Sequence, residues 1–209
     1  MIPTRSPFLA SLLLVLPPLY AGAAFESFEG DGFGNWQAEG TAFGLSPVHG
    51  KLDGMEASFR AYSNEAFVVS AHGGGAATGT LTSPEFTIKV PYIAFLIAGG
   101  DEAGKTAAQL LVDGKVVKEA TGNRSMTFGS AQFDVSALKG KKARFRIVDD
   151  SKDEWGFIAV DEIVFTSYAN TKFPSSTRNG KPYVEGLVSS PALPGATVPE
   201  GSTLKIEAT

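Results

Sequence analysis

Asp113 and Gly114 stand between two apolar runs, and this pair of residues most constrains what the chain can fold into. Both central residues of a tight two-residue hairpin turn take a positive φ, which the Asp-Gly pair accepts readily. The pair therefore predicts two antiparallel strands, over residues 109–112 and 115–118.

Residues 99–106 match the phosphate-binding pattern G-x-x-x-x-G-K-[ST] in full. That pattern binds phosphate only when a helix begins within the loop, so that the helix N-terminus faces the anion. A crossover helix between parallel strands needs a dozen residues or more, and only a few separate Thr106 from the predicted hairpin. Asp101 and Glu102 would also repel a phosphate. We interpret the segment as a turn between strands, with Lys105 toward solvent, and expect no nucleotide.

The other apolar runs are also short and are separated by glycine-rich turns, which is typical of an all-β sandwich. Residues 143–148 alternate apolar and charged side chains, as a strand with one buried face requires. One helical turn is expected at residues 135–138. The remaining expected strands are residues 25–28, 36–39, 66–71, 79–82, 85–88, 92–98, 130–135, 142–148 and 157–165. We predict an all-β jelly-roll β-sandwich, galactose-binding-like or concanavalin-like.

Both ends of the chain differ in composition from this region. Residues 1–23 combine Arg5, a short apolar stretch and small residues at 21–23, which predicts a secretory signal peptide that is too short for a membrane span. We therefore expect a secreted, periplasmic or cell-surface protein that has no membrane contact after cleavage. The sandwich is assigned to residues 24–167. Residues 168–209 are rich in proline and predict a linker or tail, or the start of a further domain of a longer exported protein.

Composition excludes several functions. The chain has no cysteine, which rules out thiolate zinc sites, a cysteine nucleophile and thiol redox chemistry. A domain of this size can fold without disulfides. The formal charge of −4 gives no basic footprint for nucleic acid.

Few residues suggest catalysis. The chain has two histidines, which argues against a three-ligand catalytic zinc site, and no G-x-S-x-G pattern accompanies a serine. The carboxylates at residues 149–154 fit a solvated loop better than a glycosidase pair. We assign no catalytic residue and incline to a chain that is not itself an enzyme.

A calcium site is the better use of the acidic residues. Asp161 interrupts an otherwise apolar strand, and a buried carboxylate needs a partner or a metal. The first and last strands of a jelly roll can lie side by side, which would bring Glu26 or Glu29 near Asp161. Hard oxygen ligands of this kind suit a structural Ca²⁺ ion. The alternative is a carboxylate held only by hydrogen bonds.

Four residues are candidates for ligand binding. His72 precedes three glycines, and it either faces a ligand or opens a glycine turn. Asp101 and Glu102 could accept hydrogen bonds from a sugar at the end of the sandwich. Trp155 could stack on a sugar ring or pack as a core residue, whereas Trp36 is expected in the core.

An ordered series of segments resembles a β-sandwich module that adjoins the catalytic domain of bacterial levanase-like, fructan-cleaving glycoside hydrolases. The same module occurs in large exported proteins of planctomycete-type bacteria. The resemblance begins with Phe28-Glu29-Gly30 and ends with the segment from Trp155 to Asp161, covering most of residues 28–165. It departs at Phe157, where the module usually has a polar residue, and at Ala98, where it often has glycine. The matching segments are residues 28–30, 34–36, 40–44, 72–74, 77–88, 92–97, 110–117, 133–135, 147–149 and 155–161.

The resemblance implies a secreted, non-catalytic carbohydrate-binding-like module, with a polysaccharide such as fructan as its partner. Nothing in the chain resembles the catalytic propeller of the fructan hydrolases. Two alternatives stay open. The chain could be part of a glycoside hydrolase whose active site lies elsewhere in the full protein, or it could be a cell-surface structural domain without sugar affinity.

Overall fold

The computed structural model describes residues 24–52, 54, 58–74, 76–171, 173, 177–178 and 181–182. The predicted signal peptide, and residues 183–209 of the predicted linker or tail, lie outside these residues. Within them, no helix is long and apolar enough to cross a membrane.

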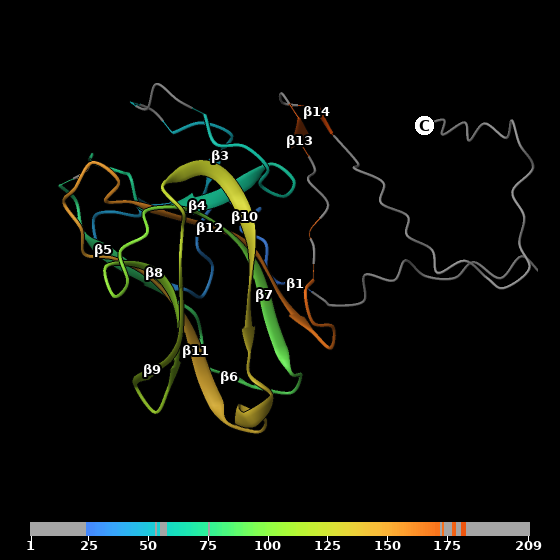
Figure 1. Cartoon of the computed structure of the whole chain (residues 1–209). Coiled ribbons are helices and arrows are strands. Elements are labelled where there is room, and N and C mark those ends of the chain that lie inside the picture. Colours follow the sequence, from blue (N-terminus) through green and yellow to red (C-terminus); the bar gives the residue numbers. More distant parts are fainter. Residues whose placement is uncertain are drawn as a thin grey trace, which may run out of the picture.

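Two antiparallel sheets pack face to face and form the predicted jelly-roll sandwich (Figure 1). The first sheet has the order β10 (Ser125–Asp134), β7 (Tyr92–Gly99), β12 (Ile158–Thr166), β4 (Ala66–Val69), β3 (Val48–His49), with β1 (Ala24–Glu26) on β12. The second has the order β2 (Gln37–Gly40), β5 (Gly79–Thr82), β11 (Lys142–Asp149), β8 (Thr106–Val112), β9 (Lys115–Thr121), with β6 (Phe86–Thr87) on β11. A 3₁₀ turn at Ser136–Leu138 and a small hairpin of β13 (Thr177–Arg178) and β14 (Lys181–Pro182) complete the described elements.

The predicted hairpin is confirmed. Asp113 and Gly114 have φ values of 51° and 72° between β8 and β9, as the tight turn requires. Each expected strand overlaps an observed one, and β8 begins at Thr106 with no intervening helix. The turn interpretation of residues 99–106 is therefore correct.

The main core lies between the sheets. Leu81, Ile147 and Ala108 are opposed across β5, β11 and β8, and all three are fully buried. Trp36 is 8% exposed in this core, which confirms its predicted place.

A second apolar cluster covers the outer face of the first sheet. Phe59, Phe67 and Phe128 pack there with Leu96 and Phe157. Both faces of β7 and β12 are consequently buried, because Ile97 and Val160 face the inner core. Strands buried on both faces lose the apolar-polar alternation, which explains the continuous apolar run from Tyr92 to Ala98.

The chain leaves the sandwich along β10. Gln132 accepts a hydrogen bond from the Asn170 N–H at 2.7 Å and donates one to the Tyr168 carbonyl at 2.9 Å. The first residues of the predicted tail are thus attached to the sandwich.

Candidate functional site

The first candidate site lies where the first and last strands meet. β1 pairs with β12, with Ala24 opposite Val164 and Glu26 opposite Ile163. The prediction that the first and last strands lie side by side is therefore confirmed. The register of the pairing between β12 and β7 shifts between Asp161 and Val164, which marks a β-bulge in β12. Glu162 lies in this bulge and has a φ of 46°. A bulge re-aims side chains, and here it places two successive carboxylates in the middle of an apolar strand.

Asp161 is fully buried and hydrogen bonded by the backbone. Its Oδ2 accepts the Ser63 N–H at 2.6 Å, and its Oδ1 accepts the Glu162 N–H at 2.6 Å. Burial raises the pKa of Asp161 well above its usual range, although both hydrogen bonds favour the charged form. Asp161 therefore has the hydrogen-bond partners that a buried carboxylate needs.

Two more carboxylates gather around the same segment. Glu29 accepts the N–H groups of Glu65 and Ala66, each at 3.2 Å. Burial raises the pKa of Glu162, and the Glu29 charge raises the pKa values of both Asp161 and Glu162. The Oε2 atom of Glu162 is buried without a hydrogen-bond partner in the described part of the chain. We define Glu29, Asp161 and Glu162 as the carboxylate cluster.

Glu26 has a different environment from the one predicted. Its Oε2 accepts the indole N–H of Trp36 at 2.9 Å, and its Oε1 accepts the N–H groups of Ser27 and Phe28. This carboxylate orients Trp36 and closes the turn after β1. Its oxygens are already engaged, whereas Glu162, absent from the predicted set, supplies the open oxygen.

The carboxylate cluster has the ligand type that calcium prefers. Its carboxylate oxygens are hard ligands, and the Glu162 Oε2 atom has no hydrogen-bond partner among the described residues. No group of three or more His, Cys, Asp or Glu among the described residues is placed to hold a metal ion. A calcium ion here would therefore need backbone carbonyls or waters beside one or two carboxylates.

The second candidate region is the end of the sandwich that carries the loop of residues 100–105. Gly99 has a φ of 100°, and a side chain there would meet the Phe157 carbonyl. A Cβ on Gly100 would meet the Trp155 carbonyl. Gly99 and Gly100, at the start of the matched segment, thus admit close backbone approach by the segment before β12.

The two predicted acidic ligands in this loop are engaged in ion pairs. Glu102 binds Lys105 at 2.9 Å and accepts the Ser151 hydroxyl at 3.3 Å. Asp101 lies 3.6 Å from the guanidinium group of Arg124. Lys105 is exposed to solvent, as predicted, and its ammonium group is paired with Glu102.

His72 sits on the glycine turn and is half-buried. Its N–H donates to the Ala42 carbonyl at 3.0 Å, and the turn continues through Gly73 and Gly74, both with positive φ. A Cβ on Gly44 would meet the imidazole ring, so the ring packs against that glycine. Desolvation lowers the pKa of His72, and its Nε2 is buried without a partner among the described residues.

Trp155 packs against Phe157, with ring centroids 5.6 Å apart and an interplanar angle of 29°. The indole is partly exposed and borders the second apolar cluster. Trp155 therefore packs in part, as one of the two predicted roles requires, and keeps part of its ring accessible to solvent, as the other requires.

Asp149, predicted to lie in a solvated acidic loop, is instead the last residue of β11 and the buried carboxylate of this end. It is 1% exposed, and its Oδ1 accepts the Ser151 N–H at 3.1 Å. Burial raises the pKa of Asp149 to about 6, and its Oδ2 has no partner within the described ranges. In the sequence, Asp149 is marked only by its place directly after the alternating apolar and charged residues 143–148.

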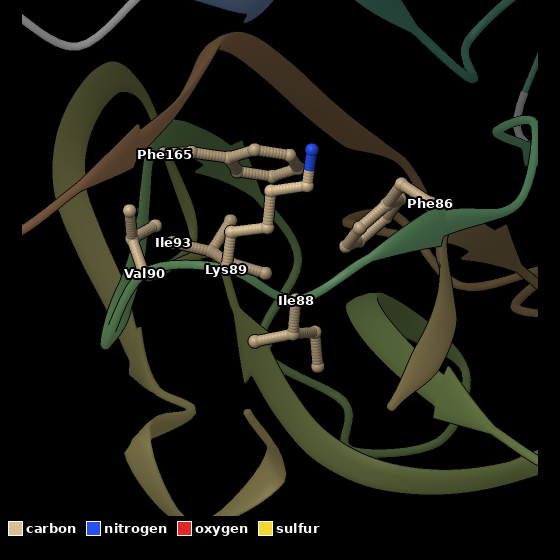
Figure 2. A pocket seen from close by; sticks show the side chains of 6 residues that line it. All are labelled: Phe86, Ile88, Lys89, Val90, Ile93 and Phe165. Atoms are coloured by element: carbon tan, nitrogen blue, oxygen red, sulfur yellow. The ribbon is translucent and has the colours of Figure 1, made fainter. Parts of the chain in front are cut away.

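A small hollow lies at the opposite edge of the sandwich. It is lined by Phe86, Ile88, Lys89, Val90, Ile93 and Phe165, whose side chains Figure 2 shows. The Phe86 and Phe165 rings pack against each other there, with ring centroids 4.8 Å apart. The hollow has no enclosed room for a water molecule, so it is a seam between the sheets and not a ligand pocket.

The chain is similar to a stretch of a larger fungal protein. It is 38% identical over 149 residues to the "Putative glycosyl hydrolase ecdE" of Aspergillus rugulosus. The matched stretch is 70% of this chain but 21% of that protein, so the chain spans about a fifth of its relative. No family model matches the chain.

Solved structures with related folds share little sequence with this chain. The K2 cleaved adhesin domain of Lys-gingipain aligns with a TM-score of 0.47 and 19% identity, over 70% of this chain and 99% of that domain. TmCBM61, solved in complex with β-1,4-galactotriose, aligns with a TM-score of 0.45 and 14% identity, over 67% and 93% of the two chains. Similarities of this size carry no conclusion about function.

Proposed function

We propose that this chain is a non-catalytic glycan-binding module of a larger exported protein that acts on polysaccharides. The observation that carries the proposal is the 38% identity over 149 residues to a fifth of the Aspergillus protein. A match of that length can span the whole sandwich of residues 24–167, and it leaves most of the relative outside the matched stretch. Fructan is the first polysaccharide to test, because the sequence resembles the module beside fructan hydrolases.

The loop end of the sandwich supports the proposal with suitable chemistry. Trp155 combines a packed ring with partial exposure, and Glu102 lies at the same end because Ser151 joins its loop to the loop before Trp155. An aromatic ring next to hydrogen-bonding groups is the usual way to hold a sugar, whose faces are apolar and whose edge carries hydroxyls.

We also propose that calcium binds at the carboxylate cluster and has a structural role. The ion would neutralise the repulsion between Glu29, Asp161 and Glu162 and would give the Glu162 Oε2 atom a partner. It would thereby fasten β12 to the segment of residues 63–66, which leads into β4.

Affinity gel electrophoresis of the full chain tests the proposal. We expect retardation in gels that contain levan, inulin or β-1,4-galactan, with no release of sugar from any of them. A Trp155→Ala variant should lose most of the retardation, while Tyr168→Ala, at an exposed aromatic outside this end, should keep it. Absence of binding to every polysaccharide would refute the proposal, and release of sugar would refute its non-catalytic part.

A further inference from the structure

The middle strand of the second sheet carries three basic residues on one face. Ala143, Phe145 and Ile147 of β11 point into the core and are at most 2% exposed. Because side chains alternate along a strand, Lys142, Arg144 and Arg146 all lie on the opposite, outer face. We call the outer side of the second sheet the arginine face.

Arg146 belongs to a polar row that crosses the whole sheet. Directly opposed residues on β2, β5, β11, β8 and β9 form this row, and all of them are polar: Gln37, Thr82, Arg146, Gln109 and Glu119. An uninterrupted polar row of this kind marks a face that meets water or a polar partner, in contrast to the apolar row beneath it.

Gln109 fixes the position of the Arg146 guanidinium group. Its Oε1 accepts the Arg146 Nε–H at 2.9 Å and an Nη2–H at 2.6 Å, while its Nε2 donates to Glu119 at 2.6 Å. Glu119 is held in turn by the Gly104 N–H at 3.0 Å. The Nη1 group of Arg146 has no protein acceptor in the described part of the chain, so it is oriented and available.

Neither arginine is neutralised by an ion pair with a described carboxylate. Lys142, on the same face, is bound to Glu85 at 2.8 Å. Arg144 donates to the Ser83 carbonyl at 3.2 Å, and its charge also lowers the pKa of Glu85. Glu119 accepts hydrogen bonds from the Gln109 side chain and the Gly104 N–H. Two guanidinium groups are therefore presented on one strand with unmatched donors.

We propose that Arg144 and Arg146 bind the carboxylate or sulfate groups of an acidic polysaccharide that lies across the arginine face. This inference rests on the proposed glycan-binding function and adds to the Trp155 end a second surface, which takes acidic glycans. Alternate residues of a strand are about 7 Å apart, and each guanidinium fork matches an oxyanion, so the pair reads acidic groups along a chain. Leu111 and Val116, aligned with Arg144 on neighbouring strands, offer an apolar shelf for the sugar rings.

The test compares acidic with neutral polysaccharides in affinity gels, using the full chain at low salt. Polygalacturonate carries carboxylates, κ-carrageenan carries sulfates, and levan and β-1,4-galactan are neutral. We expect binding to at least one acidic polymer, and the polymer bound tells which oxyanion is read. Arg144→Gln or Arg146→Gln should weaken that binding about tenfold, as expected for a lost hydrogen bond to a charged group. Lys142→Gln is the matched control and should bind as the parent does.

Several results would overturn the inference. Binding of neutral polymers alone would refute it and leave the proposed function standing, whereas binding of no polymer would refute both. An equal loss in Lys142→Gln, or equal competition by polyphosphate, would reveal unspecific attraction between charges and would also refute it. Arg144 makes a single hydrogen bond in the described structure, so Arg144→Gln decides the question if thermal melting shows that Arg146→Gln is unfolded.

Discussion

Asp161 and Ser63 are 98 residues apart in sequence, yet the Ser63 N–H donates to the Asp161 Oδ2 at 2.6 Å. This bond attaches the segment before β4 to the bulge in β12, and the same segment is held from the other side by Glu29. The carboxylate cluster is therefore a fastening between three parts of the chain that are distant in sequence.

Replacing Asp161 with alanine should destabilise the sandwich strongly. The change leaves two partly buried N–H groups without acceptors, and each unsatisfied buried group costs about 1–3 kcal/mol. We expect the free energy of unfolding in urea to fall by about 3 kcal/mol or more. Asp150→Ala, at an exposed residue just after β11, is the control and should change the free energy by less than about 0.5 kcal/mol. Equal effects of the two changes would contradict the role given to Asp161.

Calcium should raise the melting temperature of the chain. An ion that binds only the folded state at a hundred times its Kd stabilises that state by about 2.7 kcal/mol. Differential scanning calorimetry with calcium and with a chelator measures the shift. Glu162→Gln should reduce it, since an amide is a weaker calcium ligand, whereas Glu26→Gln should keep it because Glu26 is committed to Trp36. If millimolar calcium leaves the melting temperature unchanged, the cluster is held by hydrogen bonds alone.

Asp149 should make stability depend on pH. Burial raises its pKa from 3.8 to about 6, so the folded state holds the proton more tightly than the unfolded state. The free energy of unfolding contributed by this group is therefore full below pH 4 and declines as the pH rises to about 6, by about 3 kcal/mol in total. Urea unfolding of the parent and of Asp149→Asn between pH 4 and 7 isolates this contribution. The two curves should diverge with rising pH, and parallel curves would contradict the assignment.

The glycine-rich loop should respond to substitution as a structural turn. Gly100→Ala places a Cβ against the Trp155 carbonyl and the Thr106 side chain, whereas Gly32→Ala meets nothing within 4 Å. We expect the first change to lower the free energy of unfolding by about 1–3 kcal/mol, as overpacking usually does, and the second to have little effect. Isothermal titration with ATP and magnesium should give no heat of binding. Measurable nucleotide affinity that is lost in Lys105→Ala would overturn the turn interpretation.

The sequence predicted the strands well because their signals are local. The Asp113-Gly114 turn and the alternation of residues 143–148 depend on neighbouring residues, and both appear as expected in β8, β9 and β11. β3 was missed because it has two residues, and its place depends on pairing with β4.

The sites were predicted less completely because they depend on distant contacts. The pairing of β1 with β12 followed from the fold class. The bulge at Glu162 depends on the register of the strands, which the sequence does not show. For this reason Glu162, and not Glu26, has the oxygen without a hydrogen-bond partner among the described residues. The binding of Arg146 by Gln109 joins residues on different strands, and the sequence shows only that both are polar. The adjacent Asp161-Glu162 pair within an apolar strand was the available signal for the cluster.

The most direct test of the glycan-binding account is the retardation of the full chain in polysaccharide affinity gels with calcium and with a chelator. The account predicts retardation by a neutral polysaccharide that is lost in Trp155→Ala, and retardation by an acidic polysaccharide that is weakened in Arg144→Gln, with the fold of both variants intact by circular dichroism. Equal mobility in every polysaccharide gel and in the blank gel, for a folded and calcium-loaded protein, would contradict it.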